Sequence, residues 1–226
     1  MTELSVTLAN YKGAGYVIAP AGYGKTHLIA TATARSTGRQ LILTHTHAGV
    51  NSLQHKMRML GVSNRLYHID TIASWILRLA LSYSKTTGWD KERPTNNTSW
   101  NALYKSGSAL LDEEFIHRVI RASYDGLYVD EYQDCSVTQH EIILKLARIL
   151  PCRVLGDPLQ GIFNFAGQPS VDWSRDVEGS FTHLSTLGVP YRWKLTGAEE
   201  LGMWLQNARN RLLKGESIGN PPKNPQ

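Results

Sequence analysis

The residues best suited to chemistry lie in the stretch "IAPAGYGKTHLIA" (18–30), which joins an apolar run to a helical pattern. Backbone N–H groups of such a loop, together with the N-terminus of the following helix, can surround phosphate oxygens. Lys25 can reach the β- and γ-phosphates of a nucleotide, and Thr26 can bind Mg²⁺. The alternative is a tight strand-to-helix turn that happens to contain Lys and Thr. The pattern predicts a phosphate-binding loop in which Ala19 replaces the usual first glycine.

A second polar group follows the apolar run in "LYVDEYQD" (127–134). Asp130 can hold the water shell of Mg²⁺, and Glu131 can act as a base toward an attacking water. The alternative is a pair of surface acids at a strand end. Beside a phosphate loop, the pair favours a nucleotide site.

A third polar group occurs in "VLGDPLQGIFNFAG" (154–167). Gln160 is expected at the same sheet edge, where a neutral amide can sense a γ-phosphate. Phe163 and Phe165 can stack on the bases of a single strand. Their alternative is core packing, which is common for phenylalanine.

Strand-like and helix-like patterns alternate along the chain. The expected strands are 15–19, 40–46, 126–131 and 152–157, and the expected helices are 25–35, 49–60, 70–83 and 136–150. Because the strands are apolar throughout, they predict a parallel sheet with helices on both faces, which is an α/β fold. The polar stretch 84–108 predicts an insertion or a long surface loop. After Pro190, a loop is expected to lead into one amphipathic helix.

Composition limits the function without choosing it. Hydrophobic residues make up 42% of the 226 and charged residues 19%, which is typical of a globular protein. The net charge of +5 is compatible with a polyanionic partner. The two cysteines, Cys135 and Cys152, provide no disulfide framework, and no apolar run approaches the roughly 20 residues of a membrane span. A cytoplasmic protein without a membrane segment is expected.

Several motifs in order resemble the first motor domain of superfamily 1 DNA helicases of the UvrD/Rep type. "APAGYGKT" is similar to that family's A-x-x-G-x-G-K-T loop, "VDEYQD" to its D-E-x-Q-D box, and "GDPLQGIFNFAG" to its G-D-x-x-Q motif. "LILTHTHAGVNSLQHKM", "HIDTIASWILR" and "PYRW" resemble three further motifs. The resemblance implies a RecA-like P-loop NTPase with a short, mostly helical or loop insertion at about 84–120. It implies a motor domain over 1–188, with 189–226 as the start of a second domain or a helical tail.

The resemblance also implies roles for individual residues. The residues expected to contact ATP are Ala21, Gly22, Tyr23, Gly24, Lys25, Thr26, His27, Asp130 and Gln133. Thr26 and Asp130 would bind Mg²⁺, and the catalytic set would be Lys25, Glu131, Gln160 and Arg192, the last as a γ-phosphate contact. The residues expected to meet single-stranded DNA are Thr44, His45, Thr46, Thr71, Phe163 and Phe165, although the two phenylalanines could instead lie on the adenine side.

The chain departs from the family pattern at several points. No glutamine precedes Gly22 to read adenine, His47 and Ala48 replace Asn-Lys, and Asp70 replaces His. The segment after Arg192 does not resemble the rest of a second motor domain. A missing second motor domain or a partner protein is therefore expected.

The expected function is ATP binding and hydrolysis by a helicase-like domain acting on single-stranded DNA, within a 3′–5′ translocase. One alternative is a nucleotide-gated DNA-binding or interaction module without turnover. Another is a P-loop kinase for a small molecule, which would leave Gln160 and the two phenylalanines without a role.

Overall fold

The computed structural model describes residues 2–90, 94–161 and 169–218. Within them, a six-stranded sheet has the order β3-β2-β4-β5-β1-β6, and all neighbouring strands run parallel. The strands are β1 (Ala14–Ile18), β2 (Gln40–Thr44), β3 (Tyr67–Thr71), β4 (Gly126–Val129), β5 (Cys152–Gly156) and β6 (Thr182–Thr186). The prediction of an α/β fold with a parallel sheet is confirmed.

Helices occupy most of the remaining described chain. The α-helices are α1 (Thr2–Asn10), α2 (Lys25–Arg35), α3 (His47–Met59), α4 (Ile72–Ser82), α5 (Ser84–Thr87), α6 (Asn97–Leu110), α7 (Glu114–Ser123), α8 (Val137–Ile149), α9 (Tyr191–Leu195) and α10 (Glu199–Leu213). The short helical turns are η1 (Asn64–Leu66), η2 (Tyr132–Asp134), η3 (Pro158–Gln160) and η4 (Trp173–Val177). Helix α8 begins at a capping box, in which Ser136 and Gln139 satisfy each other's backbone N–H groups.

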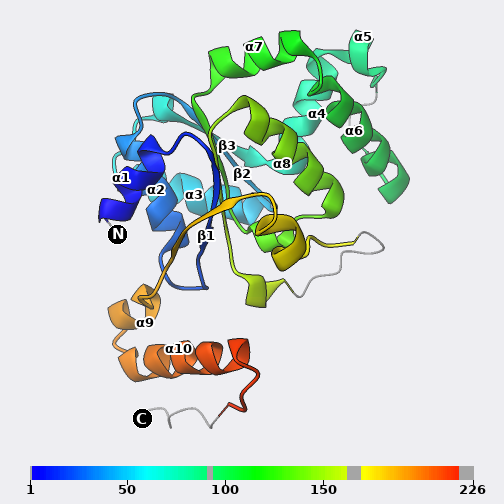
Figure 1. The fold of residues 1–226 in the computed structure, drawn as a ribbon. Helices are drawn as coiled ribbons and strands as arrows, with labels where there is room; N and C mark the ends of the chain where they lie inside the picture. Colours follow the sequence, from blue (N-terminus) through cyan, green and yellow to red (C-terminus); the bar gives the residue numbers. More distant parts are fainter. Residues whose placement is uncertain (1, 91–93, 162–168, 219–226) are drawn as a thin grey trace.

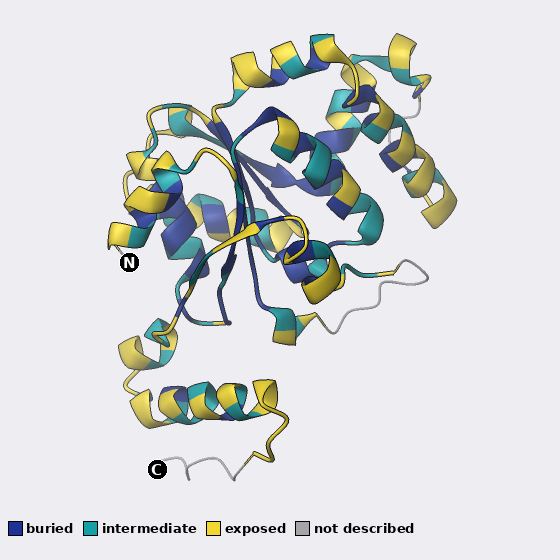
Figure 2. Ribbon diagram, viewed as in Figure 1, coloured by how far each residue is buried: buried dark blue, intermediate teal, exposed yellow. Residues whose placement is uncertain are grey.

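The helices form two layers that enclose the sheet (Figure 1). One face packs against α1, α2 and α3, and the other against α4, α6, α7 and α8. Alternate residues of strand β2 point to opposite faces of the sheet. Ile42 packs in the core on the side of α1, α2 and α3, and Leu41 and Leu43 pack in the core on the side of α4, α6, α7 and α8. The central strands β1, β2, β4 and β5 are accordingly among the most deeply buried elements (Figure 2), whereas the edge strand β6 is partly exposed.

The segment expected to be an insertion or a surface loop is largely helical. Helix α6 packs against α4 and α8. Its Leu103 and Tyr104 are buried, as is Trp89, which follows α5. These side chains belong to the same core as α8, so the segment extends the helical layer.

The chain beyond β6 forms two helices where the sequence predicted one. Gly197, with φ of 72°, separates α9 from α10. Figure 1 places both beyond the sheet, on the side where the β1–α2 loop lies. Trp193 of α9 makes an edge-to-face contact with Tyr23 of that loop, with ring centroids 6.5 Å apart. The two helices therefore adjoin the loop predicted to hold phosphate.

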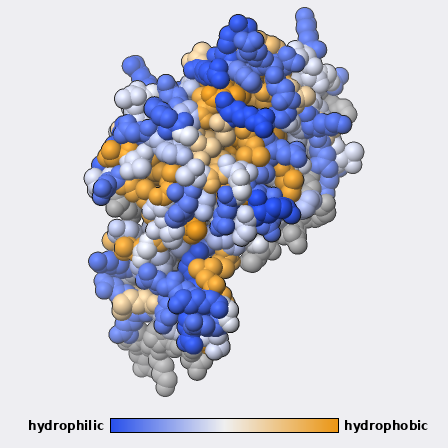
Figure 3. Space-filling view, viewed as in Figure 1, coloured by the Kyte–Doolittle hydropathy of each residue, from blue (hydrophilic) through white to orange (hydrophobic). Residues whose placement is uncertain are grey.

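The visible surface mixes hydrophilic and hydrophobic residues, as Figure 3 shows. Among the residues that the structure describes, no helix has the length and apolar character needed to cross a membrane.

Candidate nucleotide-binding site

The β1–α2 loop has the backbone of a phosphate cradle. Gly22 and Gly24 have φ values of 78° and 89°, which lie in the left-handed region that glycine adopts without a steric penalty. Gly24 is the N-cap of α2, and no side chain caps this helix start. The first backbone N–H groups of α2 therefore have no side-chain acceptor and can serve an anion.

A cavity of about 490 Å³ opens beside this loop. Its lining residues are Pro20, Ala21, Gly22, Gly24, Lys25, Thr26, His27, Lys56, Glu131, Tyr191, Arg192 and Leu195. They include most of the loop residues predicted to contact nucleotide, together with two of the other predicted catalytic residues. The sequence assigned no role to Lys56, Tyr191 or Leu195, although Lys56 and Tyr191 lie within two of the motifs that resemble the helicase pattern.

Lys25 brings the loop together with the end of β4. Its side chain is 8% exposed, its Nζ donates to Glu131 Oε2, and Asp130 Oδ1 lies 3.6 Å from the same Nζ. The two acids follow β4, which is separated from β1 in the sheet by β5. The contact forms because the carboxyl ends of parallel strands meet at one edge of the sheet.

The pKa values of the two acids shift in opposite directions. Burial raises the pKa of the Asp130 carboxyl to about 6, and the nearby Lys25 ammonium only partly offsets this effect. Burial also pushes the pKa of Glu131 upward, but Lys25 and a hydrogen bond from Gln133 outweigh it and hold that pKa below its ordinary value. Glu131 is therefore ionised at neutral pH, and Asp130 is a buried carboxylate that a cation would stabilise.

Glu131 has an unusual backbone as well. Its φ of 55° is the one left-handed value among the described non-glycine residues. Its N–H donates to Asp130 Oδ1 at 3.0 Å, and its carboxylate accepts from Gln133 Nε2 at 2.9 Å. Such backbone conformations persist only where the surroundings impose them, and they cluster at functional sites.

Gln160 is not among the residues that line the cavity. Its Nε2 donates to Asp157 Oδ2 at 2.6 Å, and Asp157 follows β5. The backbone N–H of Asp157 in turn donates to Gln133 Oε1 at 3.0 Å. The structure thus brings the two predicted glutamines to either side of Asp157, a residue to which the sequence assigned no role.

Arg192 and Tyr23 have different surroundings. The Arg192 side chain is exposed at the rim of the cavity, and its backbone N–H donates to Gly22 O at 2.9 Å. The Tyr23 ring is buried against Trp193 and does not line the cavity, so any nucleotide contact from Tyr23 would come from its backbone.

Four of the residues predicted to meet DNA lie at or just after the ends of β2 and β3, where Thr44 pairs with Thr71. These four are Thr44, His45, Thr46 and Thr71. Thr44 and Thr71 are buried, and the Thr71 hydroxyl caps α4 by accepting from Ser74 N at 3.0 Å. Thr46 is exposed and caps α3 by accepting from Gly49 N at 3.0 Å. Each threonine at a helix start is therefore explained by capping. Phe163 and Phe165 lie outside the described residues.

His45 contacts the interior and lies near the acids. Its Nε2 is 3.3 Å from the buried thiol of Cys135. Burial lowers the pKa of His45 to about 4, although the Glu131 charge opposes the shift. Burial also raises the pKa of the Cys135 thiol well above its ordinary value. Both groups are neutral near pH 7, so the pair is a structural contact and carries no reactive thiolate.

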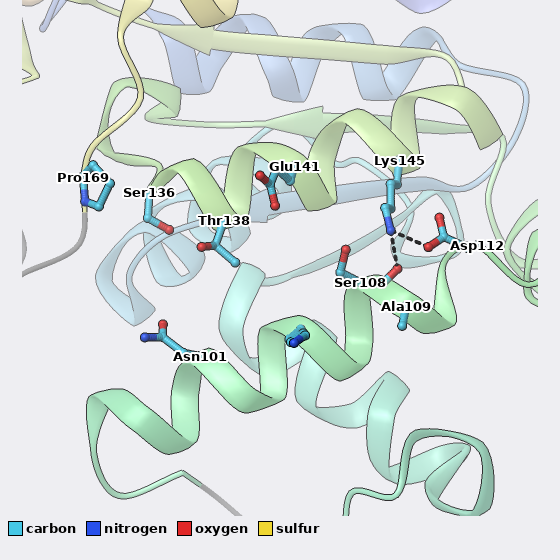
Figure 4. A pocket seen from close by; sticks show the side chains of 10 residues that line it. Asn101, Ser108, Ala109, Asp112, Ser136, Thr138, Glu141, Lys145 and Pro169 are labelled. Carbon is cyan, nitrogen blue, oxygen red and sulfur yellow. Dashed lines mark hydrogen bonds and ion pairs between the residues drawn. The ribbon is translucent and has the colours of Figure 1, made fainter.

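A larger cavity, of about 560 Å³, lies between α6 and α8. Figure 4 shows Ser136, Thr138, Glu141 and Lys145 of the α8 region facing Asn101, Ser108 and Ala109 of α6. Lys145 Nζ donates to Ser108 O at 2.9 Å and to Asp112 Oδ2 at 2.6 Å. Because this lysine is held by two protein groups and no predicted residue lines the cavity, the loop cavity is the better nucleotide site.

Two oxygen donors near this cavity suit Mg²⁺ bound together with a nucleotide. Thr26 offers a hydroxyl in the lining, and Asp130, which is 4% exposed and does not line the cavity, offers a carboxylate 3.6 Å from Lys25 Nζ. Mg²⁺ commonly takes one or two protein oxygens and completes its shell with phosphates and water. The described residues contain no group of three or more His, Cys, Asp and Glu side chains that could hold a metal ion.

Comparison with known proteins adds family evidence to this geometry. Residues 90–170 match the UvrD/REP helicase N-terminal domain. The family resemblance is confirmed. The match covers the segment that contains the D-E-x-Q-D box, and it supports a helicase-like function.

One similar solved structure is described as a complex of arterivirus nonstructural protein 10, a helicase, with DNA. It aligns with 84% of this chain at 16% identity and a TM-score of 0.44. This chain spans 39% of the length of that helicase. A search of curated proteins gave no match.

Proposed function

We propose that the loop cavity binds ATP with Mg²⁺ and that the chain is an ATP-hydrolysing, helicase-like domain of the UvrD type. The observation that carries this proposal is the position of Lys25. Its ammonium lies against Glu131 and 3.6 Å from Asp130, although 106 residues separate Lys25 from Glu131. A loop lysine, a metal-binding acid and an acidic base at one sheet edge form the group that phosphoryl transfer to water requires.

Each residue would have a defined task in that reaction. Lys25 and the first N–H groups of α2 bind the phosphates, and Thr26 and Asp130 hold the metal. Bound Mg²⁺ would supply neutralisation of the charge that develops on the phosphate oxygens. Glu131 orients the attacking water, and its low pKa keeps it ionised to accept a proton. Arg192, which is exposed at the rim, would contact the terminal phosphate.

We propose single-stranded DNA as the polymer that this domain acts on, within a 3′–5′ translocase. Thr46 is the exposed member of the predicted threonine set, and it lies at the carboxyl edge of the sheet. We further propose 1–188 as the motor domain and α9 and α10 as the start of a second domain or a helical tail. A second motor domain or a partner protein would cover the rim, where Leu195 is 85% exposed.

The contact between Lys25 and Glu131 also favours a second candidate function. In this structure the expected base is engaged by the lysine. A protein that keeps this pair after ATP binds would be a nucleotide-gated binding module without turnover. We also propose a cytoplasmic location, because both cysteines are free thiols.

The test is steady-state ATP hydrolysis by the whole chain, with and without single-stranded DNA, together with ATP binding by calorimetry. Lys25→Ala should abolish binding, because it removes the charge that holds the phosphates. Glu131→Gln should keep binding and lower kcat about 100-fold or more, since it removes the base. Lys145→Ala is the matched control, because this lysine lines the other cavity.

The outcomes separate the two candidate functions. Turnover that DNA stimulates and that both substitutions abolish supports the helicase-like ATPase. Binding without turnover in the wild-type protein, lost in Lys25→Ala, supports the gated module. Binding that persists unchanged in Lys25→Ala would contradict both functions.

A further inference from the structure

An ion pair joins helix α10 to the end of β5. Arg209 Nη1 lies 2.6 Å from Asp157 Oδ1 and 2.7 Å from Asp157 Oδ2. The two side chains are 14% and 2% exposed, so the pair is almost completely removed from water. Burying a carboxylate in this way is unfavourable unless a cation compensates it, and Arg209 is the cation that does so.

The Asp157 carboxylate also organises the turn that follows β5. Oδ1 accepts from Leu159 N at 3.1 Å, and Oδ2 accepts from Gln160 Nε2 at 2.6 Å. The backbone N–H of the same aspartate donates to Gln133 Oε1 at 3.0 Å. The position of that N–H therefore depends on a turn whose central charge is balanced by α10.

Gln133 carries the connection to the candidate site. A side-chain amide has one accepting end and one donating end. Because the Asp157 N–H holds the Oε1 end, the Nε2 end is directed at Glu131 Oε2, 2.9 Å away. A continuous series of polar contacts thus leads from Arg209, through Asp157 and Gln133, to the carboxylate that contacts Lys25.

We propose that Arg209 is a positioning residue that fixes the Glu131 carboxylate through Asp157 and Gln133. Its effect on hydrolysis rests on the proposed function, whereas its effect on the position of Glu131 does not. Removing the guanidinium leaves a buried carboxylate without a counter-ion, so Asp157 must take up a proton or the turn must move. Either change releases Gln133 from the orientation that holds Glu131.

The first test needs no nucleotide. The unfolding temperatures of Arg209→Ala, Glu131→Gln and the double variant form a thermodynamic cycle. We expect the shift in the double variant to differ from the sum of the two single shifts, because the two residues share a chain of contacts. Arg211→Ala combined with Glu131→Gln is the control, because Arg211 lies on the same helix but pairs with Glu216. Additive shifts in the Arg209 cycle would overturn the proposal.

The second test is kinetic. In Arg209→Ala we expect kcat for ATP hydrolysis to fall about 10- to 100-fold with KM changed less than about twofold, since only the reacting geometry is disturbed. Arg209→Lys should restore much of kcat, because a single nitrogen, Nη1, contacts both carboxylate oxygens and an ammonium can take its place. Arg211→Ala should leave both parameters unchanged.

The two tests distinguish this proposal from the proposed function. A wild-type protein that binds ATP without hydrolysing it counts against the ATPase, and the unfolding cycle then decides the role of Arg209. A wild-type ATPase whose kcat is insensitive to Arg209→Ala counts against Arg209 alone. If Arg209→Ala does not fold, Arg209→Gln, which keeps a hydrogen-bond donor, takes its place in both tests.

Discussion

At the scale of single residues, the candidate site depends on Lys25, whose ammonium contacts Glu131 and lies 3.6 Å from Asp130 Oδ1. Lys25, Asp130 and Glu131 were singled out because their types and positions suit phosphate and metal chemistry. The direct contact of Lys25 with Glu131 depends on the order of strands in the sheet, which no local pattern contains. Arg209 was missed, and Asp157 was quoted only as part of the G-D-x-x-Q motif, because their pairing joins a turn to a distant helix.

His45 gives a prediction at this scale. Its pKa falls from about 6.5 to about 4 on folding, so the folded state resists protonation while the unfolded state accepts it. The stability contributed by neutral His45 is therefore fully present above about 6.5 and is lost as pH falls from there toward 4. Relative to His45→Gln, the wild-type free energy of unfolding should decrease over this range, as measured by denaturant titration at several pH values.

The control for this measurement is His47→Gln, which removes an exposed imidazole two residues further along. The pH-dependent loss should persist in that variant. Parallel curves for the wild type and His45→Gln would show that the Cys135 contact does not depend on a neutral imidazole.

At the scale of elements, the sequence predicted the strands and helices that have strong apolar patterns. The strands β1, β2, β4 and β5 were expected because they are apolar runs buried on both faces. The edge strands β3 and β6 were not expected. The β6 sequence "THLST" is largely polar and partly exposed, so it resembles a loop. The helix α1 was also missed, since its two buried residues, Ser5 and Leu8, make a weak pattern.

The contact between the β1–α2 loop and α9 gives a prediction for elements. A Cβ added to Gly22 would lie 2.8 Å from Trp193 Cη2 and 3.0 Å from Arg192 Cβ, at a φ of 78°. Gly22→Ala should therefore destabilise the protein by about 2–4 kcal/mol, through backbone strain and overpacking together. Equilibrium unfolding in urea measures this change.

Gly61→Ala is the matched control, because Gly61 has a φ of 63° and nothing within 4 Å of an added Cβ. Gly61→Ala should lower the free energy of unfolding by about 1 kcal/mol, from backbone strain alone. If Gly22→Ala and Gly61→Ala lower the free energy of unfolding equally, α9 does not pack on the loop in solution.

At the scale of the whole molecule, the two cavities can be told apart by ligand-induced stabilisation. A ligand that binds only the folded state raises the free energy of unfolding by about 2.7 kcal/mol at 100 times its Kd. ATP with Mg²⁺ should raise the unfolding temperature of the wild type and of Lys145→Ala equally, and should not stabilise Lys25→Ala. Loss of the effect in Lys145→Ala instead would assign the nucleotide to the cavity between α6 and α8.

The position of β1 in the sheet also determines when the phosphate loop can fold during synthesis of the chain. Its strand neighbours, β5 and β6, both come late in the chain. The end of α1 and the residue after it also contact this strand, because Arg153 of β5 donates to Tyr11 O at 2.7 Å and to Ala9 O at 3.4 Å. As a ribosome releases the chain from its N-terminus, the phosphate loop emerges early but has no sheet to join until β5 has been synthesised. A nascent chain interrupted before Cys152 would carry the whole "APAGYGKT" motif and still lack a nucleotide site.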